Sequence, residues 1–303
     1  MQPINTILVV VDLNPTAADA VAKAVVLARK FGAHVELFMC DAERAFSLSQ
    51  AYVPTGVQEA RNSCLVQTRR YLESLKESAN ASDVTITVDC ACESPLYETI
   101  VRKVLREHPD LVIKNVARTD NRRRAEFDAT DWQLMRTCPA ALMLTRGRRW
   151  QEKPRFAAAV DASATESAGL AGGILGTAQD LLQSAGGELD ILYAEPVELA
   201  DSEREQGARV LQALTDKVRH LVPHVHVLAG NPEVSLPRFA GHRQYDAILL
   251  GALTHRPGYT AQVGTLTSKL MDALDCDFLL LKPSEYRSPI AAFQDASRHQ
   301  ERV

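Results

Sequence analysis

The chain contains one pattern written twice. An apolar run that ends in aspartate opens the first half at residues 7–12, and a second such run opens the second half at residues 156–161. Each is followed by a turn rich in small polar residues or proline and by an alanine-rich helix pattern. The halves close on similar apolar runs, at 140–144 and 278–281. A repeat of roughly 140 residues has the size of a whole domain and is too long for a solenoid unit, so we predict a tandem duplication.

Apolar strand patterns alternate with helix patterns through both halves. This order predicts crossover connections and a parallel sheet, and strands without polar alternation indicate that both sheet faces are covered. The expected fold is therefore α/β, with two tandem open doubly wound domains that each have a five-stranded, mainly parallel sheet. The expected strands are 5–12, 34–40, 84–88, 111–113, 140–144, 156–160, 188–193, 225–228, 247–250 and 278–281, and the expected helices after residue 50 are 57–78, 95–106, 164–183, 200–220, 232–241 and 264–273.

Proline, glycine and arginine between residues 146 and 154 suggest a solvated linker. We accordingly expect domains at 1–148 and 154–285, with a loosely attached polar tail at 286–303. A turn with a helix start is expected at 14–16, where proline fits the first helical turn.

Composition excludes several classes of protein. The net charge of −4 argues against nonspecific binding to nucleic acid. No apolar run approaches the ~18–20 residues of a membrane helix, and the first residues show no signal-peptide pattern. We therefore expect a cytoplasmic protein that binds neither nucleic acid nor membrane. The six cysteines are expected to be structural thiols, and no metal site is expected. His224 and His226 could form a metal pair or a solvated strand edge, and we favour the edge.

The loop after the fourth strand of the second half contains candidates for anion binding. Gly251 begins it, and Gly264 and Thr265 open the next helix. Glycine lets a backbone approach phosphate closely, and the free N–H groups of a helix start attract anions. The hydroxyls of Thr265 and Thr267 could donate to phosphate, and His255 lies in the loop. The alternative is that the glycines are turn residues and Thr265 an ordinary cap residue.

These residues resemble the nucleotide motif of the universal stress protein family. The family motif is glycine, two residues, glycine, nine residues, then glycine and serine or threonine. Gly251, Gly264 and Thr265 keep its spacing, whereas Thr254 replaces the second glycine and Gly258 is out of register. The resemblance also implies an adenine-side aspartate at Asp161, with Val160 beside it, and a further phosphate-side hydroxyl at Thr267.

The first half departs from the motif. No glycine occurs from Lys114 to Arg146, and the arginines at 118 and 122–124 are expected to lie on the surface. The run at 129–139 is similar to one in the two-domain, UspE-like branch of the family. The resemblance implies a stress-response binding protein, with ATP or a related adenine nucleotide in the second half, and two halves packed as a pseudo-dimer.

Two other functions stay open. One is a degenerate member that binds no nucleotide and acts through an apolar ligand or a protein partner. The other is an enzyme such as a slow nucleotidase, against which stands the absence from the sequence of an activated nucleophile or a metal motif. We expect a binding protein and no enzyme, and a homodimer is a further expectation.

Overall fold

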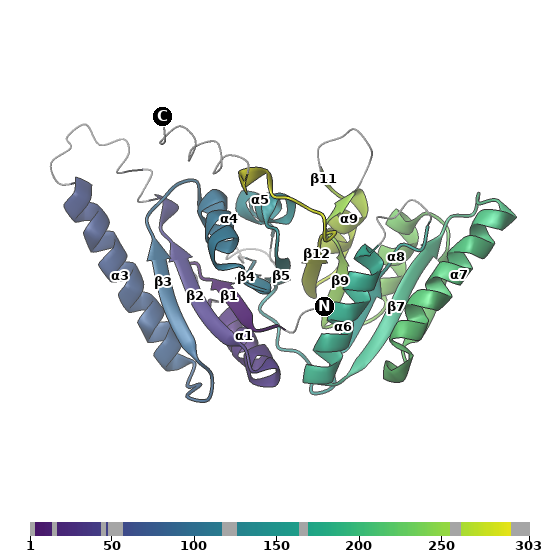
Figure 1. Cartoon of the computed structure of the whole chain (residues 1–303), viewed down its shortest axis with the longest axis horizontal. Coiled ribbons are helices and arrows are strands. Elements are labelled where there is room, and N and C mark those ends of the chain that lie inside the picture. The colour runs from purple at the N-terminus through teal and green to yellow at the C-terminus, as the bar shows by residue number, and fades with distance from the viewer. Residues whose placement is uncertain are drawn as a thin grey trace. The chain divides into compact units, whose positions relative to one another are not determined.

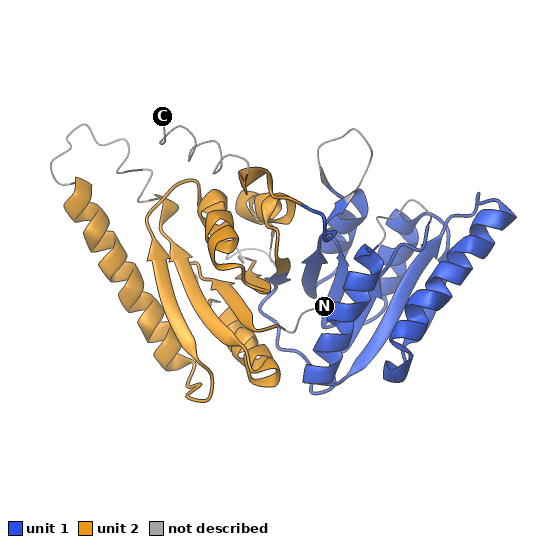
Figure 2. Cartoon of the chain, viewed as in Figure 1, with its two compact units in different colours: residues 1–3, 143–286 blue, residues 4–142, 287–303 orange. Residues whose placement is uncertain are grey.

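The computed structural model describes residues 4–13, 17–43, 47, 57–116, 126–163, 169–254 and 262–291, without the side chains of Thr254 and Gln262. The chain divides into two compact units (Figure 2). The N-terminal unit comprises residues 4–142 and 287–303, and the C-terminal unit comprises residues 1–3 and 143–286. The division falls inside strand β5 (Ala141–Thr145), before the linker expected at 146–154.

The N-terminal unit is built on parallel strands in the order β3-β2-β1-β4, with β5 following β4. Helices connect successive strands (Figure 1). The strands are β1 (Thr6–Val10), β2 (His34–Cys40), β3 (Ile86–Ala91) and β4 (Leu111–Asn115), and the helices are α1 (Ala17–Phe31), α3 (Val57–Ser78), α4 (Leu96–Glu107) and α5 (Ala129–Thr137).

The C-terminal unit repeats this design with the strand order β12-β9-β6-β7-β8, again parallel. A short antiparallel pair, β10 (Leu253–Thr254) and β11 (Gln262–Val263), is added after β9. The other strands are β6 (Arg155–Ala159), β7 (Glu188–Glu195), β8 (His224–Ala229), β9 (Ala247–Gly251) and β12 (Asp277–Leu281), and the helices are α6 (Leu170–Ala185), α7 (Asp201–Lys217), a 3-10 turn (Arg219–Leu221), α8 (Pro232–Gly241) and α9 (Thr265–Ala273).

The predicted α/β class with mainly parallel sheets is confirmed. The central strands β1, β4, β6, β9 and β12 are buried along nearly their whole length. Burial on both faces is what an apolar strand without alternation requires. The candidate residues lie at or after the carboxyl ends of these strands, which is where α/β proteins bind ligands.

The structure adds two elements that the sequence pattern does not predict. Helix α5 is short, and its residues lack a strong apolar repeat. The β10–β11 pair consists of two residues on each strand, which is too short for a period-two pattern. The expected helix at 200–220 ends at Lys217 and continues as a separate 3-10 turn.

The expectation that the arginines at 146–149 lie on a solvated linker is wrong for Arg146. Its side chain is buried, and its Nη2 donates to the carbonyl oxygen of Met271 at 2.6 Å. The backbone N–H of Arg146 donates to Asp277 Oδ1 at 3.0 Å, and the guanidinium lies over the ring of Phe278. These contacts join the segment after β5 to the C-terminal unit.

Several expectations fall outside the described residues. These are the turn at 14–16, the arginines at 118 and 122–124, the loop 255–261 with His255 and Gly258, and the tail beyond residue 291. Within the described start of the tail, Ile290 is buried. None of the helices described is long and apolar enough to cross a membrane.

Candidate functional site

Asp161 lies just after the carboxyl end of β6, at the edge where the sequence places the adenine-side residue. Its side chain is exposed, and Oδ1 accepts a hydrogen bond from the backbone N–H of Ser163 at 2.8 Å. Val160 beside it is buried, and its N–H donates to the carbonyl of Leu192 on β7 at 3.0 Å. The strand ladder therefore fixes Val160, and a local turn fixes the carboxylate of Asp161.

The neighbouring Tyr193 on β7 is buried near Asp161. Burial raises the pKa of its phenol, and the negative charges of Asp161 and Glu195 raise it further. The phenol therefore stays protonated at neutral pH and can donate a hydrogen bond at this edge of the sheet.

Gly251 and Thr267 are joined to one another. Gly251 ends β9, and the hydroxyl of Thr267 on α9 donates to its carbonyl oxygen at 3.0 Å. Thr267 is buried, and this bond uses its proton. The described geometry therefore gives Thr267 the role of holding α9 against β9. A side chain at position 251 would meet Leu170, whose Cδ2 lies 2.9 Å from the place of a Cβ atom.

The start of α9 has no side-chain cap. Gly264 is the N-cap residue, with an extended backbone (φ −63°, ψ 142°), and Thr265 beside it is exposed. The first N–H groups of a helix have no partner inside the helix. With no N-cap side chain to accept from them, these donors and the positive end of the helix dipole are left for an anion.

Thr254, which departs from the family motif, lies in β10 opposite Gln262. Among the described residues, Asn80, His108 and Val222 have a positive φ angle without being glycine, and Thr254 does not. Thr254 is therefore in the extended backbone region, which suits a β-branched residue. Replacing glycine at this position places no strain on the described backbone.

The equivalent edge of the N-terminal unit is filled by charged side chains. Lys114 on β4 is fully buried, and its Nζ lies 2.9 Å from Asp131 Oδ1, 3.2 Å from Asp12 Oδ2 and 3.7 Å from Asp128 Oδ2. We call these four residues the Lys114 cluster. Asp131 is itself buried, so the cluster brings charge deep into the unit.

The same carboxylates cap helix α5. Asp128 Oδ1 accepts from the N–H of Asp131 at 2.7 Å, and Asp131 Oδ2 accepts from the N–H of Asp128 at 3.0 Å. This reciprocal arrangement is a capping box. It uses the N–H groups of Asp128 and Asp131, and it places negative charge where a phosphate would bind.

The positions in the two units correspond one to one. From α4 to β5 each element of the N-terminal unit starts 136 residues before its partner in the C-terminal unit, as in α5 (Ala129) and α9 (Thr265) or β4 (Leu111) and β9 (Ala247). The matched pairs at this edge are Lys114 with Leu250, Asn115 with Gly251, Asp128 with Gly264, and Asp131 with Thr267, while Asp12 matches Asp161 after the first strands.

The Lys114 cluster perturbs its own members. Burial raises the pKa of Asp131 to about 6, against the opposing charge of Lys114. Burial alone would lower the pKa of Lys114, but the charges of Asp131, Asp12 and Asp128 outweigh it and raise that pKa. One ammonium cannot neutralise three carboxylates, so the most buried carboxylate is the one that most readily takes a proton.

Sequence reasoning did not find the Lys114 cluster. A lysine inside the apolar strand 111–115 was one available signal, and the acid three residues after Asp128, at the start of α5, was another.

His224 and His226 were expected on a solvated strand edge. In the structure, both also contact the buried carboxylate of Asp190, His224 Nδ1 at 3.4 Å and His226 Nε2 at 3.3 Å. Among the residues described, no group of three or more histidine, cysteine or acidic residues could hold a metal ion.

The six cysteines are free thiols, and five of them are buried. Burial raises the pKa of Cys40 to about 11 and that of Cys92 to about 12. The thiolate is the reactive form of cysteine. These two side chains are therefore unreactive, as expected for structural thiols.

Comparison with known proteins identifies the family. Residues 3–146 match the model of the universal stress protein family. Universal stress protein E of Salmonella typhi is 25% identical, over 94% of this chain and 96% of its own length. The corresponding protein of Escherichia coli K12 is 24% identical over the same shares.

Solved structures agree in fold. A universal stress protein of Archaeoglobus fulgidus is similar with a TM-score of 0.70 at 12% identity, over 93% of this chain and 99% of the other. Residues 3–146 therefore carry a universal stress protein domain, and the chain, with two units of one α/β fold, is similar over nearly its whole length to universal stress protein E.

Proposed function

We propose that the chain is a stress-response binding protein whose C-terminal unit holds ATP or a related adenine nucleotide, and whose N-terminal unit holds none. The phosphates would lie at the uncapped start of α9, at Gly264 and Thr265. Asp161 would accept from the base or the ribose. The observation that carries the proposal is the contrast between Gly264 and its counterpart Asp128, because one helix start offers free donors and the other is closed by carboxylates.

Charge supports the same asymmetry. The Lys114 cluster contains three carboxylates and one ammonium, so its net charge is negative even when Asp131 is protonated. Two unit charges 4 Å apart interact by about 4 kcal/mol at an effective dielectric constant of 20. A polyphosphate at this edge of the N-terminal unit would therefore be repelled.

The direct test transfers the N-terminal residue to the C-terminal site. In full-length Gly264→Asp, the new carboxylate should cap α9 and repel phosphate, and the Kd for ATP measured by calorimetry should rise at least about tenfold. Asp128→Asn is the matched control, because it changes the equivalent helix start in the other unit and should leave the Kd unaltered. An unchanged Kd in folded Gly264→Asp would remove α9 from the site.

A further inference from the structure

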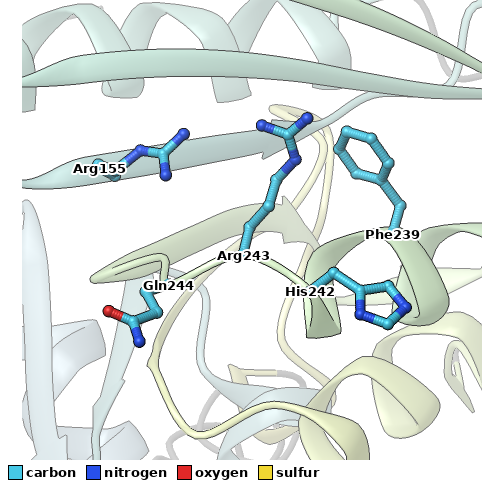
Figure 3. A pocket seen from close by; sticks show the side chains of 5 residues that line it. All are labelled: Arg155, Phe239, His242, Arg243 and Gln244. Atoms are coloured by element: carbon cyan, nitrogen blue, oxygen red, sulfur yellow. The ribbon is translucent and has the colours of Figure 1, made fainter.

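A second cluster of charged side chains lies in the C-terminal unit, among residues at or before the amino ends of the strands. A cavity of about 580 Å³ there is lined by Arg155, Phe239, His242, Arg243 and Gln244. Arg155 is the first residue of β6, and Arg243 follows α8. Figure 3 shows the side chain of Arg155 extending toward that of Arg243, whose guanidinium group lies beside the ring of Phe239. We call this the Arg155–Arg243 pocket.

One buried carboxylate lies beside the two arginines. Asp190 on β7 is 2% exposed, and its Oδ2 accepts from the hydroxyl of Tyr245 at 2.6 Å. Oδ2 also lies 3.5 Å from Arg243 Nη1 and 3.9 Å from Arg155 Nη2. Two permanent positive charges therefore share a single buried negative one. Glu188 approaches Arg155 at 3.3 Å, but its side chain is 55% exposed, so solvent screens that pair.

The arginines are held in place by aromatic rings. The guanidinium of Arg243 lies 4.3 Å from the ring centre of Phe239, and that of Arg155 lies 5.8 Å from the ring centre of Tyr245. A guanidinium carries five N–H donors in its own plane. Contact through the flat face leaves the edges of the plane for hydrogen bonds, and such edges match the geometry of phosphate and carboxylate.

The N-terminal unit has a counterpart in which the buried cation is paired internally, beside a cavity of about 520 Å³ that Asp89 and Lys103 also line. There Lys103 on α4 is 4% exposed, and its Nζ lies 2.7 Å from Glu36 and 2.8 Å from Asp89. This ammonium lies between the two carboxylates and satisfies them internally. Glu107 lies 3.7 Å away on the same helix.

The register of the strands and the 136-residue spacing match these positions to the Arg155–Arg243 pocket. Glu36 and Asp89 correspond to Asp190 and His226, and Lys103 and Glu107 correspond to Phe239 and Arg243. Three carboxylates and an ammonium have thus become one carboxylate, an imidazole, a phenyl ring and a guanidinium. The internal lysine is lost, and the cavity is lined instead by two arginines that share one buried carboxylate.

We propose that the Arg155–Arg243 pocket binds a small oxyanion of the phosphate or carboxylate type between its two guanidinium groups. The pocket lies away from Gly264 and Asp161, which follow the carboxyl ends of their strands, so this site is separate from the proposed nucleotide site. Burial lowers the pKa of the neighbouring His226, so the two guanidinium groups supply the positive charge of the pocket. Phe239 supplies an apolar wall for the remainder of the bound molecule.

The test is a titration of the full-length protein followed by NMR of arginine Nε–H groups, at constant ionic strength maintained with chloride. Inorganic phosphate is the probe in one series and acetate in the other. We expect saturable shifts of Arg155 and Arg243 with at least one of the two, and the tighter probe identifies the ligand class. Shifts that grow linearly with both probes would overturn the proposal.

Two pocket variants and two control variants make the test specific. Arg243→Gln and Arg155→Gln should each weaken the response at least about tenfold. Arg238→Gln is the matched control, because it removes an exposed arginine from helix α8, five residues before Arg243, and should leave the response intact. Gly264→Asp should also leave it intact, which separates this site from nucleotide binding. Unaltered affinity in both folded pocket variants would overturn the assignment.

Discussion

At the scale of single residues, the two units differ most at position 114, where the N-terminal unit buries a lysine and the C-terminal unit has Leu250. An ammonium without exposure needs close partners, and Lys114 has three carboxylates within 3.7 Å. Removing one partner of a buried ion pair costs about 3–5 kcal/mol, since the other charges stay buried without compensation. The cluster therefore makes the stability of the fold depend on a buried charge at the carboxyl ends of the strands.

We predict that Lys114→Met lowers the free energy of unfolding by about 3–5 kcal/mol at neutral pH. The loss should be smaller near pH 5. Burial already holds the pKa of Asp131 at about 6, above its unfolded value, so below that pH this carboxylate is neutral in the folded state and no longer needs the ammonium. Urea unfolding at both pH values measures the difference.

The control is Lys269→Met. Lys269 pairs with Glu233 at 2.7 Å, but its side chain is 47% exposed, so its loss should cost about 1 kcal/mol or less at either pH. A Lys114→Met protein as stable as this control would show that the Lys114 cluster contributes little.

These residue-scale features could be predicted only in part from sequence. Asp161, Gly251 and Gly264 stand at recognisable places in a repeated pattern, so their positions at strand ends could be anticipated. The Lys114 cluster joins residues 12, 114, 128 and 131, and only the folded chain brings these together. The same holds for Asp190 and Arg243, which are 53 residues apart.

At the scale of elements, α5 and α9 show how one helix can be started in two ways. Both have nine residues. Asp128 and Asp131 close the first with a capping box, whereas Gly264 leaves the second open. Helix α5 was missed in the sequence because it is short and capped by polar residues. The central strands could be predicted because burial on both faces requires a continuous run of apolar residues.

The β10–β11 pair gives a prediction at this scale. Because Thr254 lies in an extended strand, glycine there is not needed for the backbone to adopt its conformation. We expect that Thr254→Gly changes the Kd for ATP less than about threefold, measured by calorimetry on the full chain. A gain of tenfold or more would mean that threonine restricts the loop in the bound state.

At the scale of the whole molecule, the duplication has produced two copies of one fold with opposite chemistry at equivalent places. At the carboxyl ends of the strands, the N-terminal unit is closed by the Lys114 cluster and the C-terminal unit offers an open helix start. At the other cluster, Lys103 pairs with Glu36 and Asp89 in the N-terminal unit, and Arg155 and Arg243 share the single buried carboxylate of Asp190 in the C-terminal unit. In both places the N-terminal unit pairs a buried ammonium with carboxylates of its own.

The domain organisation follows from the repeat, but the place where the units divide does not. The sequence suggests a linker at 146–154, whereas the contacts divide the chain inside β5. Arginine and glycine look like linker residues, and only the folded chain reveals the bond from Arg146 to Met271. Experiments on this protein should therefore keep the chain whole, since a cut at residue 148 would separate Arg146 from the partners that bury it.

Counting bound nucleotides on the intact chain tests the central claim most directly. Native mass spectrometry of the full-length protein with excess ATP should show one nucleotide per chain, none in Gly264→Asp, and one in Asp128→Asn. Two nucleotides per wild-type chain would contradict the account, because one would then bind where the carboxylates of the Lys114 cluster should exclude it. One nucleotide retained by Gly264→Asp would also contradict it, because the start of α9 would then not be the phosphate site.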